Sequence, residues 1–487
     1  MKTLSLRVGR IAIILLAFFL AVPVFAARKN NVQSKDDPRQ SFLGDIPASP
    51  GSVILGRPTD RSITASVLWV KDTRIVIHYG ADESMKQHSE MFTLKGGEPR
   101  EIILDNLRPN ASYQYRVIDT ATKKPLLPVD GTGRFHTQRS RGESFTFTIQ
   151  ADSHLDGFCM PEMYETMLRN ALSSRPDFHI DLGDTFMTGK IPKRSTAARQ
   201  YTAQHHWLGL IGHSAPVFLV LGNHDGEEAR KKEAVSANGI AVWSCLQRKR
   251  YFPNPIHYGF YTGNTIRQPY AGDLQNYYAW EWGDAQFVVL DPYWYSGSTR
   301  GGKEPWNMTL GKTQYDWLAK TLRTSTTKFK FVFIHQLVGG LDKGARGGAE
   351  AARLFEWGGH DKTGANRFAN ERPGWQQPIH DLLVETGVTI VFHGHDHFFA
   401  HQQLDGVTYQ LVPQPAHRNF RNHHAEEYGY IKGDFLPNSG HLNVRVTPEQ
   451  TTVAYIRSAT PSIERRGITN GNTAFIYSCK PRLRTKK

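Results

Sequence analysis

Five short blocks of polar residues in the chain contain side chains that bind metal ions in other proteins. The blocks are Asp152-Ser153-His154, Gly183-Asp184, Gly222-Asn223-His224-Asp225, the single His335, and His393-Gly394-His395-Asp396-His397. Carboxylate, amide and imidazole donors together suit Mn, Fe or Zn, and the cysteines are not spaced as in a structural zinc site. A lone Asp or His is more often a cap or a satisfied polar group, so the prediction depends on all five blocks together.

Each of these blocks directly follows a predicted β-strand. Apolar stretches at residues 145–150, 178–182, 217–221, 286–290, 329–334 and 388–392 alternate with helical patterns at residues 162–174, 198–212, 313–324 and 375–386. This alternation is typical of an α/β fold, in which ligands bind beyond the carboxyl ends of the strands. We therefore expect the five blocks to meet at one edge of a sheet, where Gly183, Gly222 and Gly394 permit tight turns.

In this order the blocks resemble those of the calcineurin-like metallophosphoesterase superfamily, which are Asp-x-His, Gly-Asp, Gly-Asn-His-Asp/Glu, a lone His and Gly-His-x-His. The resemblance covers residues 152–397 and implies an α/β fold with a β-sandwich flanked by helices. It also implies a centre of two divalent or trivalent metal ions, Mn, Fe or Zn. The implied ligands are Asp152, His154 and His397 for one ion, Asn223, His335 and His395 for the other, and Asp184 as a bridge between both.

The implied reaction is hydrolysis of a phosphate ester by a hydroxide ion that bridges the two metal ions. Two cations ~3.5 to 4 Å apart lower the pKa of the bridging water and offset charge on the attacking and leaving oxygens. The resemblance places His224 beside the leaving group as a proton donor or oxyanion stabiliser, and Asp225 is expected to orient its ring. Phosphomonoesters are favoured over phosphodiesters as substrates, although the same metal set serves both.

Residues 51–139 are predicted to form a small all-β domain ahead of the phosphoesterase domain at residues 140–460. Expected strands at residues 62–70, 74–79, 101–104, 113–118 and 133–137 have the spacing of a β-sandwich. The stretch Leu104-Asp-Asn-Leu-Arg-Pro-Asn-Ala-Ser-Tyr-Gln-Tyr115 resembles a turn of fibronectin type III modules.

This domain order also resembles that of the purple acid phosphatases, with two departures at the predicted site. Met187 stands where those enzymes have a metal-binding Tyr, and His154 has no counterpart in them. We therefore expect neither a charge-transfer colour nor an obligatory ferric ion. Two long segments, residues 243–276 and 337–373, interrupt the α/β pattern and are expected to form lids or binding loops.

The first 26 residues have the pattern of a secretory signal peptide, in which a basic start precedes an apolar run at residues 11–25. This run is shorter than the ~20 residues that span a bilayer. We expect cleavage after Ala26, a polar linker over residues 27–50, and a secreted or periplasmic protein without a membrane span. Residues 461–487 are predicted to be a basic C-terminal tail.

The formal net charge of +14 favours anionic partners such as phosphate esters, and equally serves solubility. One alternative is a non-catalytic secreted binding or adhesion protein on the same scaffold. The complete set of metal ligands argues against this alternative. Nucleic-acid binding by charge alone is a second alternative, but the chain lacks a recognisable binding module and no specific nucleic-acid partner is expected.

Cys159, Cys245 and Cys479 allow at most one disulfide. The oligomeric state stays open.

Overall fold

The structure of the protein is a computed structural model that describes residues 44, 46–128, 131–229, 232–297, 304–464 and 468–482. The predicted signal peptide and most of the predicted linker lie outside these residues. Among the helices that are described, none combines the length and the apolar character needed to cross a membrane.

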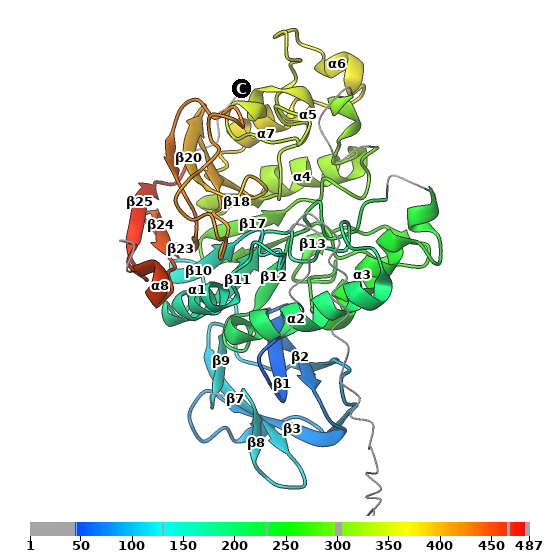
Figure 1. The fold of residues 1–487 in the computed structure, drawn as a ribbon, viewed down its shortest axis with the longest axis vertical. Helices are drawn as coiled ribbons and strands as arrows, with labels where there is room; N and C mark the ends of the chain where they lie inside the picture. The colour runs from blue at the N-terminus through cyan, green and yellow to red at the C-terminus, as the bar shows by residue number, and fades with distance from the viewer. Residues whose placement is uncertain are drawn as a thin grey trace, which may run out of the picture. The chain divides into compact units, whose positions relative to one another are not determined.

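Two β-sheets packed face to face form the centre of the α/β part (Figure 1). The six-stranded sheet has the order β12 (Val217–Leu219), β11 (Phe178–Asp181), β10 (Phe145–Gln150), β23 (Gly440–Val446), β24 (Thr451–Arg457) and β25 (Thr473–Cys479). The eight-stranded sheet has the order β13 (Thr262–Gly263), β16 (Tyr278–Trp282), β17 (Ala285–Val289), β18 (Phe329–Phe333), β19 (Ile390–His393), β21 (Val407–Leu411), β20 (Phe399–Leu404) and β22 (Asp434–Leu436). The strands β10, β11 and β12 are parallel to one another, as are β17, β18, β19 and β21. A small hairpin joins β14 (Arg267–Gln268) to β15 (Gly272–Asp273).

Aromatic side chains from both sheets fill the space between them. Phe147 of β10 lies with its ring centroid 5.2 Å from that of Phe287 of β17, in an edge-to-face arrangement. Every residue of β17 and β18 is buried, because helices cover the face of this sheet that is turned away from the other sheet. Burial on both faces explains why these strands read in the sequence as continuous apolar runs.

Helices cover the outer face of each sheet (Figure 1). Helices α1 (Pro161–Ser173) and α2 (Arg194–Gly212) pack on the six-stranded sheet, and α4 (Lys312–Thr324) and α7 (Ile379–Glu385) pack on the eight-stranded sheet. Helix α4 buries Tyr315, Leu318 and Leu322, whose spacing of three and four residues places them on one helical face. The other helices are α3 (Ile240–Tyr251), α5 (Phe355–Gly358), α6 (Phe368–Glu371) and α8 (Pro461–Glu464).

The N-terminal strands form a separate β-sandwich with its own core. One sheet contains β1 (Gly51–Gly56), β2 (Ile63–Trp69) and β6 (Arg100–Leu104). The other contains β4 (Gln87–His88), β3 (Thr73–Gly80), β7 (Ser112–Asp119) and β8 (Pro125–Leu127), with β5 (Phe92–Leu94) paired to β3 and β9 (Gly133–His136) paired to β7. Ile63, Ile77 and Ile102 are fully buried between these sheets. The predicted fold class is thereby confirmed, whereas the likeness to fibronectin type III modules stays a prediction.

Two features of the fold differ from the expectations, and a third settles whether a disulfide forms. The strands that precede the polar blocks belong to two sheets, and not to one. Thr473–Cys479, within the predicted tail, is strand β25 and pairs with β24, because Phe475 and Tyr477 pack against the central core while charged residues dominate only beyond this strand. All three cysteines are free thiols, so the possible disulfide does not form.

Candidate metal centre

The five polar blocks meet where five strands end. Strands β10, β11 and β12 of one sheet lead into Asp152, Asp184 and Asn223, while β18 and β19 of the other lead into the histidine blocks. Two groups of donors result, and within each group the donor atoms lie within 4.8 Å of one another. The groups are Asp152 with His154 and His397, and Asp184 with His335 and His395.

One oxygen of Asp184 lies between the two groups. Oδ2 of Asp184 is 3.3 Å from Nε2 of His154 and 3.4 Å from Nε2 of His335. Oδ1 of Asp152 is 3.3 Å from Nε2 of His397. Two ligands bonded to one ion at ~2.1 Å lie at most about 4.2 Å apart, so these spacings fit shared coordination.

Three buried donor atoms in the centre lack a hydrogen-bond partner among the described residues. They are Oδ1 of Asp152, Oδ1 of Asn223 and Nε2 of His335. A buried polar atom without a partner costs about 1 to 3 kcal/mol, so three in one place need an explanation. Cations at the two groups would satisfy the atoms of Asp152 and His335, which belong to these groups, and the donor set therefore fits a pair of metal ions.

The second ring nitrogen of three histidines is held by a neighbouring oxygen atom. Each such bond fixes the ring and leaves the other nitrogen as the one that a metal ion would bind after loss of its proton. The pairs are His154 Nδ1 with Asp156 Oδ2 at 3.3 Å, His335 Nδ1 with the Leu182 carbonyl at 2.9 Å, and His395 Nε2 with the Gly344 carbonyl at 2.7 Å.

Backbone amides hold the outer oxygens of both carboxylates. The amide of His224 donates to Oδ1 of Asp184 over 2.7 Å, and the amide of His395 donates to Oδ2 of Asp152 over 2.9 Å. Burial alone would raise the pKa of both carboxyls, but nearby imidazoles, including that of His335 beside both groups, hold both pKa values below the usual range. Both groups are therefore ionised, as metal ligands must be.

The backbone at the centre is strained in the way that functional sites often are. Asp152, His154, Asp184, His395 and His397 have φ angles of 60°, 52°, 53°, 77° and 66°. This left-handed region is unfavourable for residues with a side chain, at a cost of order 1 to 3 kcal/mol each, and persists only where the surrounding packing imposes it. The left-handed backbone conformation turns these side chains toward one another at the strand ends.

Gly222 is required at this site by close packing. A Cβ atom at this position would lie 2.1 Å from the backbone nitrogen of Asp184 and 2.3 Å from its Oδ1. At Gly394 a Cβ atom would lie 2.9 Å from Oδ2 of Asp152. Gly222 thus permits close approach between the ends of the adjacent strands β11 and β12, and Gly394 permits it between β10 and β19 of the two sheets.

His224 lies at the edge of the centre, with 19% of its side chain exposed. Its Nε2 is 3.7 Å from Oδ2 of Asp184, and its ring centroid is 5.6 Å from that of His154. Burial lowers the pKa of His224 well below its usual value, although Asp184 raises it. The ring is therefore uncharged at neutral pH and can reach a molecule bound at the centre.

Asp225 contacts the backbone and not the His224 ring that it was expected to orient. Its Oδ1 accepts a hydrogen bond from the amide of Phe186 over 2.7 Å, and its Oδ2 accepts one from Gly222 over 2.6 Å. Burial raises the pKa of this carboxyl, and the charge of Asp184 raises it further. The geometry gives Asp225 the task of holding two ligand-bearing turns together.

Two contributors to the centre were missed by sequence reasoning. Asp156 is buried and lies only two residues after His154, a spacing that was available as a signal. The carbonyl group of Gly344 reaches His395 from the long segment 337–373, as expected of a loop near the metals. No side-chain pattern in the sequence marks a backbone carbonyl as a ligand support.

Comparison with known proteins identifies a family and similar folds. Residues 145–399 match the model of a family described as calcineurin-like phosphoesterase. A solved structure of PhoD is similar at 15% identity and a TM-score of 0.62, over 90% of this chain and 92% of that one. Purple acid phosphatase PPD1 from yellow lupin (Lupinus luteus) seeds is similar at 12% identity and a TM-score of 0.56, over 90% and 76% of the two chains. At these identities the likenesses show the fold. No curated protein sequence matches the chain.

Proposed function

Because the chain belongs to the calcineurin-like phosphoesterase family and is a metal-dependent phosphoester hydrolase, we propose that it is a secreted two-metal enzyme acting on phosphomonoesters in preference to phosphodiesters. The observation that carries the two-metal part is the position of Asp184. One of its oxygens lies within 3.4 Å of imidazole nitrogens from both donor groups. A carboxylate in this place is suited to bridge two cations.

The proposed ligands are those that the resemblance implied. Asp152, His154 and His397 hold one ion, Asn223, His335 and His395 hold the other, and Asp184 contacts both. When bound, two such ions lower the pKa of a water molecule and offset the charge of the phosphoryl oxygens. The three buried atoms without hydrogen-bond partners among the described residues support this set, since all three belong to proposed ligands, Asp152, Asn223 and His335.

In this proposal His224 acts on the substrate and not on the metal ions. Its half-buried ring is uncharged at neutral pH and can donate one hydrogen bond to the leaving oxygen. Asp184 holds the His224 backbone amide, so movement of the bridging carboxylate would also move this ring. Asp225 fixes the turn from the other side through Gly222.

The charge near the centre supports a preference for monoesters. A monoester carries roughly −1.5 to −2 charge near neutral pH, more than a diester does. The Lys190 ammonium group is close enough to lower the pKa of both His154 and His224, and so adds a positive charge near the centre. The phosphatase named in one structural neighbour is consistent with this preference. The predicted signal peptide at residues 1–26 supports secretion or a periplasmic location.

The test combines elemental analysis of the purified protein with hydrolysis of an aryl phosphomonoester and the corresponding bis-aryl diester. We expect close to two metal ions per chain and a higher kcat/KM for the monoester. Faster hydrolysis of the diester would overturn the preference and leave the two-metal centre intact. Protein that binds no metal, and that added metal cannot activate, would overturn the proposal as a whole.

A further inference from the structure

A cavity of about 430 Å³ lies where the N-terminal β-sandwich meets the α/β part. Its charged lining residues are Arg134 of β9, Arg139, Arg175 and Asp177. From the arrangement of these groups we infer that the cavity is a second anion site, which binds a phosphate group or a similar tetrahedral oxoanion between Arg134 and Arg175. This site is separate from the metal centre.

The only carboxylate among these lining residues is already fully paired. Arg139 binds Asp177 through two parallel hydrogen bonds, with Nε 2.7 Å from Oδ2 and Nη2 2.9 Å from Oδ1. Nε1 of Trp282 donates a third hydrogen bond to Oδ2 over 2.9 Å. The charge of Asp177 is therefore offset by Arg139, and the guanidinium groups of Arg134 and Arg175 carry the excess positive charge of the cavity.

Arg134 lines the cavity and has an unused donor. Its Nη2 is buried, and none of the described residues accepts a hydrogen bond from it. Burial lowers the pKa of Arg134, and the nearby charge of Arg175 lowers it further, against the opposing effect of Asp177. Two cations near each other, one with a buried unpaired N–H group, are stabilised by an anion that accepts hydrogen bonds from both.

The wall that carries Arg134 is held firmly against the α/β part. The amide of Arg134 donates to Oγ of Ser214 over 3.2 Å, and the hydroxyl group of Tyr115 donates to the carbonyl of His213 over 2.8 Å. At Gly133 a Cβ atom would lie 2.9 Å from this same carbonyl, so the strand is in close contact there. The backbone that carries Arg134 is thus already fixed before an anion binds, which lowers the entropic cost of binding.

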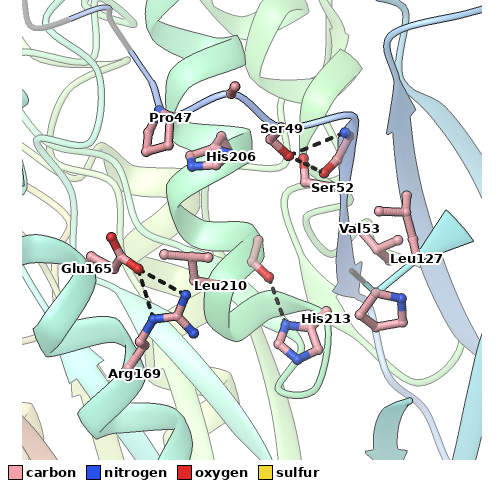
Figure 2. A pocket seen from close by; sticks show the side chains of 14 residues that line it. Pro47, Ser49, Ser52, Val53, Leu127, Glu165, Arg169, His206, Leu210 and His213 are labelled. Atoms are coloured by element: carbon pink, nitrogen blue, oxygen red, sulfur yellow. Dashed lines mark hydrogen bonds and ion pairs between the residues drawn. The ribbon is translucent and has the colours of Figure 1, made fainter. Parts of the chain in front are cut away.

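A neighbouring cavity at the same junction has no such excess of positive charge, because its acidic and basic side chains pair with each other. This cavity of about 230 Å³ contains Glu165 and Arg169, which Figure 2 shows paired with each other across one turn of α1. His213 in its wall hydrogen-bonds the carbonyl of Gly209 over 2.9 Å. Of these two cavities, the one lined by Arg134 and Arg175 has the excess of positive charge.

Strand β11 separates the proposed anion site from the metal centre. Asp177 directly precedes this strand, and Asp184 follows its other end. A strand of four residues spans about 13 Å, so one anion cannot contact both places. Binding at the two sites can therefore be measured independently.

The test is equilibrium binding of inorganic phosphate to the metal-loaded full chain, at an ionic strength near 0.15 M so that weak surface attraction is screened. Arg134→Gln and Arg175→Gln remove one guanidinium each. Arg61→Gln, which removes the same charge from an exposed side chain of the sandwich, is the matched control. We expect the wild type and the control to bind one more phosphate per chain than either cavity variant, or to bind it at least about tenfold more tightly.

Two further measurements, with phenylphosphonate and with Asp184→Asn, sharpen the outcome. Because Arg175 is exposed, Arg175→Gln should fold even if Arg134→Gln does not. Phenylphosphonate, as a second ligand, separates a site for free phosphate from one that accepts the phosphate group of a larger molecule; either result supports the inference. Equal phosphate binding by the wild type and both cavity variants would overturn it. So would complete loss of phosphate binding in Asp184→Asn, which would place all of the bound anion at the metal centre.

Discussion

Oδ2 of Asp156 lies 3.3 Å from Nδ1 of His154, and both side chains are buried. Burial would raise the pKa of Asp156, but the hydrogen bond from His154, its charge and the amide of Phe158 together lower it to about 2. The carboxylate is therefore ionised throughout the neutral range and holds the ring with Nε2 toward Asp184.

This contact predicts that Asp156→Asn weakens metal binding by about 10- to 100-fold, since loss of a partner that orients a metal-binding histidine typically has this effect. Activity should recover in part when excess metal is added, because the ligands themselves remain. Metal titration followed by phosphomonoester hydrolysis measures both quantities. Asp273→Asn, at a half-exposed carboxylate beside Arg267, is the control. Unchanged metal affinity in Asp156→Asn would show that the hydrogen bond has no orienting role.

Asp184→Asn tests the proposed bridge. The substitution removes the negative charge that lies within 3.4 Å of both histidine groups, so we expect loss of metal occupancy and of turnover together while the fold is kept. Elemental analysis, activity and circular dichroism on the same preparation distinguish loss of metal from loss of structure. Full activity in this variant would contradict the assignment of Asp184 as the bridge.

His224→Asn tests whether the ring acts on the substrate. We expect kcat to fall about 10²- to 10⁴-fold, the usual range for loss of a general acid or base, while metal content stays near the wild-type value. His257→Asn, at an exposed histidine, serves as the matched control. A variant that loses metal ions instead of turnover would show that His224 is a ligand or a support for one.

Gly222→Ala tests the close approach of the turns. The added Cβ atom would lie 2.1 Å from the backbone nitrogen of Asp184, so this residue must move. We expect a loss of about 1 to 3 kcal/mol in the free energy of unfolding, together with weaker metal binding. At Gly297 the nearest atom to an added Cβ is 3.6 Å away, so Gly297→Ala should change neither quantity. Wild-type metal affinity in Gly222→Ala would contradict the argument.

Buried neutral histidines away from the centre predict acid sensitivity. Burial lowers the pKa of His179, His205 and His441 from 6.5 to about 3. Between these values the unfolded chain binds more protons than the native one, so stability is complete above pH 6.5 and falls as the pH drops toward 3. The expected loss near pH 5 is about 2 kcal/mol for each histidine.

Urea denaturation at pH 7 and near pH 5 measures this effect, with His205→Gln as the informative variant. His205 contacts Oγ of Ser52 at 2.7 Å and Oγ of Ser66 at 3.2 Å, so the variant should be less stable than the wild type at pH 7. Its stability should nevertheless change less between the two pH values. The same pH dependence in both proteins would mean that other groups cause the acid sensitivity.

Much of the site was predictable because its chemistry is local in the chain. Asp152, Asp184 and His335 each follow an apolar run of strand length, and such a run places the next residue at a strand end whatever the rest of the fold is. The donor types of the blocks, and their order, then led to the phosphoesterase resemblance. Helix α4 was equally predictable, because a helix buries apolar residues spaced three and four apart on one face.

Other features depend on which segments pack together, and no local pattern encodes that. The assignment of β10 and β18 to different sheets follows from long-range strand pairing, and the Gly344 carbonyl reaches His395 from 51 residues away. Strand β25 was not predicted, because the charged residues beyond it dominate the composition of the C-terminal segment. Only its pairing with β24 identifies it as a strand. The excess charge beside Arg134 likewise arises only when Arg139 takes Asp177 as its partner, since a sequence lists charges but tertiary contacts decide which of them are offset.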